Sequence, residues 1–314
     1  MSTSQTPVRL PARNVEVVLG AAGVKGPAHI GLLRCLEERR VSIGRLTGAS
    51  AGSLIATFKA NGYDSHEMER IFTSEGFRYP DWNIWAQCLH LYDPWNWWKR
   101  MLEGGLPGML DFGPWLSHLV DEYELKPQDN LRIVATDLLT RQPIIFEGRG
   151  INLKRALKAS TGVISVGMEP AWLPAGEPHS HKGGAACDNP LGHYAADGFY
   201  YHPEPADLCD SPAIVSKVGF ATRWPSERLS PGDLLMHVRE MMEAPLLSAL
   251  YPDHPGHLTV NVGLPDVASL TFGLSQHKID QLVHNGYCQA CRALSDHHAE
   301  EWLHAKNCVC HDED

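Results

Sequence analysis

Two stretches near the start of the chain decide its fold class: Val15-Glu-Val-Val-Leu-Gly-Ala-Ala-Gly-Val-Lys-Gly26 and Leu46-Thr-Gly-Ala-Ser-Ala-Gly52. The first opens on an apolar, β-branched run typical of a buried strand, and the second is expected to contain the end of another strand. A helix follows each glycine-rich turn, over Pro27 to about Arg40 and over Ser53 to about Asn61. This order of strand, turn and helix, repeated, predicts an α/β fold with a parallel sheet.

The same rhythm returns further along the chain. Strands are predicted at 131–135, 144–146, 213–220 and 258–262, and helices at about 152–159, 230–250 and 276–305. Residues 174–190 are rich in Pro, Gly and His and are predicted to form an exposed loop. We therefore expect one domain over 1–314, a three-layer α/β/α sandwich with a central, mostly parallel sheet and a core at about 15–294.

Six of the nine tryptophans lie between Asp81 and Trp115, which predicts an aromatic-rich helical cap inserted at about 64–128. The cap has two interpretations: a lid that meets a lipid interface, or a small buried subdomain that covers a pocket. The second is favoured. Either one places an apolar wall beside the site described below, as a long acyl chain requires.

Composition and charge exclude several classes of protein. The chain of 314 residues is 43% hydrophobic and 20% charged, unlike a disordered or fibrous protein, and its net charge of -10 argues against nucleic-acid binding. No run approaches the roughly 18 apolar residues of a membrane span, and Met1 to Arg13 lacks the apolar centre of a secretion signal. We expect a cytoplasmic protein that contacts membranes only at their surface, with its oligomeric state open.

Eight cysteines in a chain of this kind are typical of reduced thiols rather than of a disulfide framework. Cys288 and Cys291 lie one turn apart on a predicted helix and are followed by a tail rich in His and Cys at about 297–314. Four of these side chains could in principle hold zinc, but Cys-x-Cys-His is not a common zinc spacing. Scattered thiols without metal are the preferred interpretation.

The pattern Gly48-x-Ser50-x-Gly52 lies between a predicted strand and a predicted helix. A nucleophilic serine on such an elbow is exposed to substrate, and the small residues around it, Ala49 and Ala51 included, let the chain turn tightly. The alternative is a plain turn with a serine that caps the helix. The neighbouring turn favours the nucleophile.

That turn, Gly20 to Gly26, has three interpretations. A dinucleotide loop requires Gly where Ala21 stands, and a phosphate-gripping loop requires Ser or Thr after Gly-Lys, whereas Lys25 is followed by Gly26. An oxyanion loop needs only backbone amides, so alanine is acceptable there. The third interpretation fits best, because parallel neighbouring strands place their carboxyl ends together, next to Ser50.

These motifs, in this order, resemble those of the patatin-like phospholipase family. The resemblance covers the loop at 19–31, the elbow at 46–55, Ala135-Thr-Asp-Leu138, Ala159-Ser-Thr161 and Ala196-Asp197-Gly198. It implies a Ser–Asp dyad without histidine: Ser50 is the nucleophile, Asp197 the general base, and amides around Ala21, Ala22 and Gly23 hold the oxyanion. It implies that an acyl-enzyme forms and that neither a metal nor an organic cofactor is needed.

The chain departs from the family pattern in three ways: Ala21 and Ala22 interrupt its run of glycines, Phe199 follows Asp-Gly, and Ile164 stands where proline is frequent. Asp-Gly is also a common turn pair, so a structural role for Asp197 with Gly198 is the alternative. Most of the 17 histidines, including those at 174–193, are predicted to be surface residues.

The resemblance implies a lipid acyl hydrolase of the phospholipase A, lysophospholipase or lipase type, with a lipid ester as its partner. A carboxylesterase or thioesterase for shorter acyl chains is the alternative within the same chemistry. A non-catalytic lipid-binding protein is the alternative from another class, and it would have no need of both Ser50 and Asp197.

Overall fold

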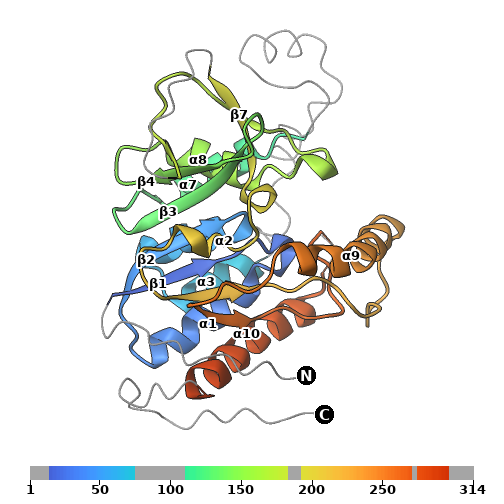
Figure 1. Ribbon diagram of the computed structural model, residues 1–314. Helices are drawn as coiled ribbons and strands as arrows, with labels where there is room; N and C mark the ends of the chain where they lie inside the picture. The colour runs from blue at the N-terminus through green and yellow to red at the C-terminus, as the bar shows by residue number, and fades with distance from the viewer. Residues whose placement is uncertain (1–13, 75–109, 183–191, 271–273, 297–314) are drawn as a thin grey trace.

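The computed structural model describes residues 14–74, 110–182, 192–270 and 274–296 (Figure 1). Within them, one nine-stranded sheet contains β1 Val15–Leu19, β2 Ile43–Ala49, β3 Leu131–Asp137, β4 Pro143–Glu147, β5 Ala171–Leu173, β6 Ser180–His181, β7 His193–Asp197, β8 Ala213–Lys217 and β9 Leu258–Asn261. The α-helices are α1 Pro27–Glu38, α2 Ala51–Ala60, α3 Ser65–Thr73, α7 Gly113–Glu122, α8 Leu153–Thr161, α9 Pro231–Leu250 and α10 Gln276–Asp296. Short 3-10 helices are η1 Gly23–Lys25, η3 Ile164–Val166, η4 Gly198–Tyr200 and η5 Ala206–Leu208.

The centre of the sheet is parallel and one side of it is antiparallel. Five neighbouring strands, in the order β3-β2-β1-β8-β9, pair in parallel, as the α/β prediction requires. Beyond β3, the strands β4, β5, β6 and β7 pair antiparallel and form what we call the antiparallel flank. The flank was not predicted as a unit, because β5 and β6 are too short to show a periodic pattern in sequence.

The sheet lies between two unequal layers. Val17 and Leu19 of β1 face the main core, which also contains residues of α1, α2, α8 and α10. Their neighbour Val18 faces the other side and packs on Ala206 of η5. This alternation follows from the side-chain period of a strand, which points successive residues to opposite faces. The fold is therefore the predicted α/β class, with a thick helical layer on one face and a thinner layer around η5 on the other.

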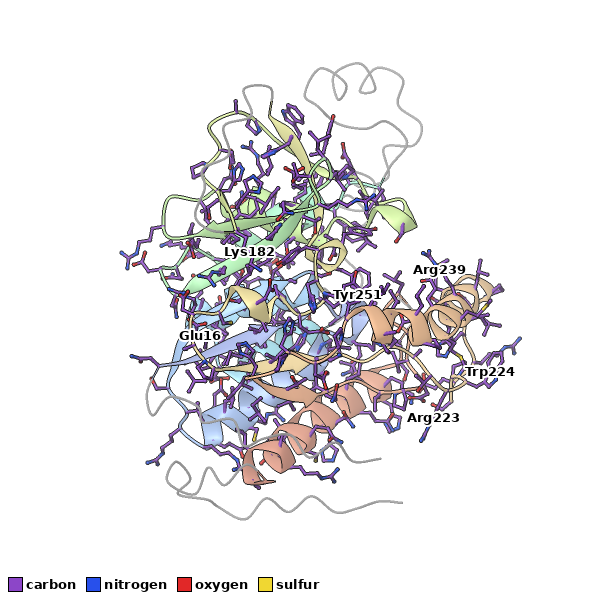
Figure 2. All side chains as sticks on the ribbon, in the orientation of Figure 1. Glu16, Lys182, Arg223, Trp224, Arg239 and Tyr251 are labelled. Carbon is purple, nitrogen blue, oxygen red and sulfur yellow. The ribbon has the colours of Figure 1, made fainter. Side chains whose placement is uncertain are left out.

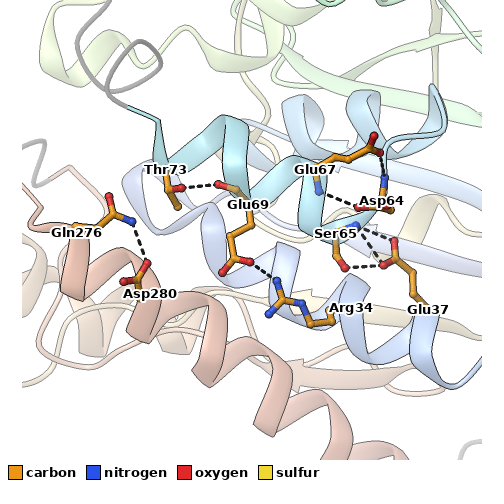
Figure 3. Close-up of polar contacts among 9 residues, drawn as sticks. All are labelled: Arg34, Glu37, Asp64, Ser65, Glu67, Glu69, Thr73, Gln276 and Asp280. Carbon is orange, nitrogen blue, oxygen red and sulfur yellow. Dashed lines mark hydrogen bonds and ion pairs between the residues drawn. The ribbon is translucent and has the colours of Figure 1, made fainter.

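The helical layer is held together by apolar and polar contacts. Figure 1 shows α1 and α10 side by side, and the two helices pack closely. Figure 3 shows how α3 is fixed: Asp64 caps its first turn together with Glu67, and Glu37 of α1 accepts hydrogen bonds from the Ser65 N–H and hydroxyl. An ion pair between Arg34 of α1 and Glu69 of α3 continues this connection.

Two predicted regions lie largely outside the described residues. Most of the cap at 64–128 falls there, with five of its six tryptophans, whereas Trp115 is on α7 and packs edge-on against Phe112 at a ring distance of 5.9 Å. The His/Cys tail at 297–314 also lies outside. Among the described helices, none combines the length and apolar character needed to cross a membrane.

Candidate active site

Ser50 occupies the turn between β2 and α2 in a conformation that L-residues seldom adopt, with φ 54° and ψ -131°. Such a conformation costs on the order of 1–3 kcal/mol and persists only where neighbouring groups hold it. Two hydroxyls do so: the Ser50 N–H donates to Oγ of Ser160 (3.0 Å), and Oγ of Ser53 donates to the Ser50 carbonyl (2.6 Å). This strained turn is the geometry that a nucleophile elbow requires.

The two glycines of the elbow are needed because other backbone segments approach them closely. A Cβ atom on Gly52 would lie 2.2 Å from the carbonyl oxygen of Leu19, at the end of β1. A Cβ atom on Gly48 would lie 2.4 Å from Cα of Ser53, in the first turn of α2. Both separations are far below contact distance, so only glycine lets β1, β2 and α2 come together here.

The pairing of β3 explains why Ser50 meets Asp197. Ala49, the last residue of β2, pairs with Val134 of β3, and Asp197, the last residue of β7, pairs with the next residue, Ala135. Strand β4 pairs with Arg132 to Thr136 and so occupies one whole edge of β3. Strands β2 and β7 must therefore share the opposite edge. The two strands run towards each other and end at the same point, with Ser50 and Asp197 face to face.

The contact between the two side chains is direct and buried. Oγ of Ser50 donates to Oδ2 of Asp197 at 2.6 Å, while Oδ1 of Asp197 accepts from the backbone N–H of Phe199 at 2.8 Å. Asp197 is 0% exposed and Ser50 is 6% exposed. Gly198 is required beside them, because a Cβ atom there would lie 2.5 Å from the carbonyl oxygen of Val134. Burial raises the pKa of Asp197 to about 7, although both hydrogen bonds act to lower it.

The predicted oxyanion loop needs a correction at its first residue. The Ala21 N–H donates to the carbonyl oxygen of Pro203 at 2.7 Å, so this amide is already engaged. Among the described residues, no acceptor is recorded for the amides of Ala22 and Gly23, and both residues border the cavity beside Ser50. Ala22 has a φ of -138°, which alanine adopts freely, whereas Gly23 has a φ of 53° and needs glycine. Alanine at position 22 thus fits the backbone at a place where the family has glycine.

His29 fixes the start of this loop from behind. Its Nε2–H donates to the Gly20 carbonyl (2.9 Å), because a carbonyl only accepts, and its Nδ1 therefore accepts from the hydroxyl of Ser216 (2.7 Å). Complete burial lowers the pKa of His29 to about 4, which keeps the ring neutral. None of the described histidines has a recorded hydrogen bond to Ser50.

A buried lysine connects the loop to α9. Lys25 donates to the Gly219 carbonyl (2.6 Å) and pairs with Glu240 (3.1 Å), whose carboxylate also accepts from the Ser269 N–H at 2.6 Å. The Ser269 carbonyl in turn accepts from the N–H of Val24 at 2.9 Å. Lys25 is thus a structural residue of the loop rather than a phosphate ligand.

Sequence reasoning missed three supporting residues: Ser160, His29 and Glu240. Ser160 lies within the motif Ala159-Ser-Thr161, so the resemblance marked its position but not its bond to Ser50. His29 and Glu240 carried no local signal, because their partners are distant in the sequence.

A cavity of about 140 Å³ lies over Ser50 and Asp197. Phe199 and Phe220 form part of its wall, so the unusual residue after Asp-Gly borders the pocket, as its position suggested. Helix α9 contributes Met236, Arg239 and Leu247. Figure 2 shows Arg239 projecting from α9, where its guanidinium pairs with Glu243 at 2.9 Å. The cavity wall therefore combines aromatic rings with charged side chains of α9, since Glu240 also lines it.

The described cysteines do not gather into a metal site. Cys288 and Cys291 both lie on α10, as predicted, but Cys291 is buried against Cys35 of α1 (Sγ–Sγ 2.8 Å), while Cys288 lies 3.5 Å from His284. A different group, His179 with His181 and His193, brings ring nitrogens together. Its burial corrects the prediction that the histidines of 174–193 are surface residues, because His193 is only 6% exposed.

Comparison with known proteins agrees with the motif order. The sequence model of the family described as Patatin-like phospholipase matches residues 17–209, a range that includes both Ser50 and Asp197. The lysophospholipase NTE1 of Mycosarcoma maydis is 38% identical over 65 residues, which are 21% of this chain and 3% of that protein. The uncharacterized protein YqhO of Bacillus subtilis (strain 168) is 40% identical over 57 residues, 18% of this chain and 20% of that protein. The match thus spans only a small part of either relative.

Among solved structures, VipD from Legionella pneumophila aligns with 95% of this chain and 72% of its own, at 15% identity and a TM-score of 0.48.

Proposed function

Because this chain belongs to the patatin-like phospholipase family, we propose that it is a lipid acyl hydrolase in which Ser50 is the nucleophile and Asp197 the general base. The observation that carries the proposal is the hydrogen bond of 2.6 Å from Ser50 Oγ to Asp197 Oδ2 on a strained elbow. A purely structural pair has no need of a strained serine at the floor of a cavity. The alternative of a non-catalytic lipid-binding protein is disfavoured for the same reason.

In the first half of the reaction, Asp197 removes the hydroxyl proton as Ser50 Oγ attacks the ester carbonyl carbon. The negative charge that develops on the carbonyl oxygen is stabilised by the amides of Ala22 and Gly23 and by the positive end of α2. When the carbon–oxygen bond of the ester breaks, the proton held by Asp197 passes to the leaving alcohol. The acyl group then remains on Ser50.

In the second half, water replaces the alcohol. Asp197 accepts a proton from the water as its oxygen attacks the acyl-enzyme, and the proton returns to Ser50 when the fatty acid leaves. A carboxylate with an ordinary pKa near 3.9 is too weak a base for this task. The raised pKa of Asp197, about 7, matches the requirement, because burial makes the charged form more basic.

The surroundings of the cavity support a lipid substrate. Helix α9, which contributes to the cavity wall, also carries a row of exposed apolar side chains: Leu235, Met242, Leu246 and Leu250. Such a face on a helix is suited to contact with a lipid aggregate. We therefore propose that substrate enters from a lipid surface that α9 touches transiently.

One observation favours the second candidate, an esterase or thioesterase for short acyl chains. The cavity formed by the described residues, about 140 Å³, is smaller than the roughly 300–1,000 Å³ typical of sites for larger ligands. The acyl-chain profile decides between the two candidates.

The test uses the purified full chain and p-nitrophenyl esters from acetate to palmitate, followed by lysophosphatidylcholine and phosphatidylcholine. We expect hydrolysis that depends on Ser50 and Asp197, with kcat/KM rising towards long acyl chains. A maximum at acetate or butyrate identifies the short-chain enzyme instead. If wild type, Ser50→Ala and Asp197→Asn release nitrophenol at one indistinguishable rate, both enzymatic proposals fail.

The pH dependence of kcat/KM is a second expected result. Since the base must be ionised and its pKa is about 7, activity falls about tenfold for each pH unit below 7 and levels off above it. Glu204 is the matched control, because burial also raises its pKa to about 7. The acidic limb should keep its position in Glu204→Gln. A limb near 4 in the wild type, or its disappearance in Glu204→Gln, contradicts the assignment to Asp197.

A further inference from the structure

Three histidines converge in the antiparallel flank, away from the proposed catalytic pair. His179 and His181 lie beside and within β6, and His193 begins β7. One ring nitrogen from each lies within 4.8 Å of the other two. Four residues of extended chain, about 13 Å, separate His193 from Asp197 on the same strand, so the cluster does not belong to the active site.

The hydrogen-bond partners of two rings fix where their protons lie. Nδ1 of His179 lies 2.7 Å from the Glu177 carbonyl oxygen, and Nδ1 of His193 lies 3.2 Å from Oδ2 of Asp137. Because carbonyl and carboxylate oxygens only accept, both Nδ1 atoms carry the hydrogen. In neutral rings each Nε2 then presents a lone pair, and these two nitrogens face each other at 3.0 Å.

Two lone pairs at this distance repel unless a cation lies between or beside them. A third ring nitrogen lies nearby: Nδ1 of His181 is buried, and no hydrogen bond to it is recorded among the described residues. Imidazole nitrogens held in one orientation by a carboxylate and a carbonyl oxygen are the usual arrangement around a transition metal. From these contacts we propose that His179, His181 and His193 bind one divalent transition-metal ion, with Zn²⁺ the preferred species.

The geometry fits such an ion after small side-chain rotations. Zinc–nitrogen bonds of about 2.0–2.1 Å in a tetrahedral site place the nitrogens about 3.4 Å apart, between the 3.0 Å and 4.8 Å observed here. Three imidazoles leave the fourth position to water. Asp137 is well placed to orient His193, because its other carboxylate oxygen is fixed by the Leu139 N–H (2.8 Å) and the Thr140 N–H (3.2 Å).

The proposed metal site joins β6 to β7, and its role is structural rather than catalytic. The bound ion would connect two segments of the flank, at positions 179–181 and 193, that are not adjacent in the sequence. Since β7 ends at Asp197, the ion would anchor the strand that presents the proposed base. No step of ester hydrolysis passes through it.

The test uses the full chain, freed of metal with a chelator and titrated with Zn²⁺ against a zinc-binding dye. We expect one tight equivalent in the wild type that is lost in His179→Gln and in His181→Gln. The control is His118→Gln, because His118 is 51% exposed and pairs with Glu122 in the same helix. Asp137→Asn keeps the three ligands and should weaken Zn²⁺ binding about 10–100-fold. Mg²⁺ and Ca²⁺, which prefer oxygen ligands, should not compete.

Cobalt substitution separates this site from the cysteines. The wild type with Co²⁺ should show visible bands of a nitrogen-ligated site without the near-ultraviolet charge-transfer band of a thiolate, and His179→Gln should lose them. His179 is half-buried and lies outside regular strands, so its replacement should not disrupt the fold. Circular dichroism verifies that His179→Gln is folded. Equal binding by wild type and His179→Gln, a thiolate spectrum, or no tight equivalent would overturn the proposal. The last result would mean that the two Nε2 atoms share a proton instead.

Discussion

Ser50→Ala is expected to lower kcat for any ester substrate on the order of 10⁵-fold, to the level that binding and the oxyanion amides alone provide. Without the hydroxyl, residue 50 has no side-chain oxygen to form the acyl-enzyme. The measurement is the initial rate with the best p-nitrophenyl ester, under saturating conditions, for wild type and variant.

The fold should tolerate this change. Alanine keeps the Cβ atom and the backbone of the elbow, including the N–H bond to Ser160. The matched control is Ser248→Ala, an exposed serine on α9, which should retain wild-type kcat. A folded Ser50→Ala protein that keeps more than about a tenth of the wild-type rate would show that another group is the nucleophile.

Asp197→Asn is expected to lower kcat about 10²–10⁴-fold, the usual contribution of a general base. The amide has nearly the same shape, and its oxygen can still accept from the Phe199 N–H. Its nitrogen then faces Ser50 Oγ as a donor, so the serine proton has no acceptor. The acidic limb of the pH profile near 7 should disappear with it. Asp210→Asn, at a carboxylate whose side chain is 77% exposed, is the control and should leave both rate and profile unchanged.

The same substitution should change how stability depends on pH. Below about pH 4 the carboxyl of Asp197 is protonated in both the folded and the unfolded chain, so it does not affect stability. As pH rises, the unfolded chain ionises first, because the folded pKa is about 7, so the wild type loses stability up to pH 7. The difference of about three pKa units between the two states corresponds to at most about 4 kcal/mol in the free energy of unfolding. Asp197→Asn should therefore gain stability relative to wild type between about pH 5 and about pH 8, measured as urea midpoints. If the stability difference between variant and wild type is the same at pH 5 and pH 8, Asp197 is ionised at both pH values in the folded protein.

The elbow of the proposed active centre was predictable because its determinants are local. The elbow at 48–52 requires two glycines for close approach, and these residues are visible in the sequence whatever lies around them. Most of the parallel strands were recognisable from short apolar runs such as Val15–Leu19. Asp197, by contrast, was placed only by resemblance, since the pairing of β2 and β7 on one edge of β3 has no sequence signature.

The errors have a common physical origin in contacts between distant segments. The Ala21 amide was assigned to the oxyanion, but it bonds to Pro203, whose position no local pattern reveals. The histidines of 174–193 were predicted to be exposed because the segment is rich in Pro and Gly. In the folded chain His193 pairs with Leu173 of β5 and is buried, while His179 and His181 are half-buried.

The most direct test of the central claim is to stop a reaction of the wild-type protein with a long-chain p-nitrophenyl ester by acid during steady state, digest it and locate the acyl group by mass spectrometry. The acyl mass should be found on the peptide that contains Ser50 and on no other peptide, and it should be absent from Ser50→Ala treated in the same way. An acyl group on a different residue, or rapid hydrolysis that persists in Ser50→Ala, would contradict a mechanism built on Ser50 and Asp197.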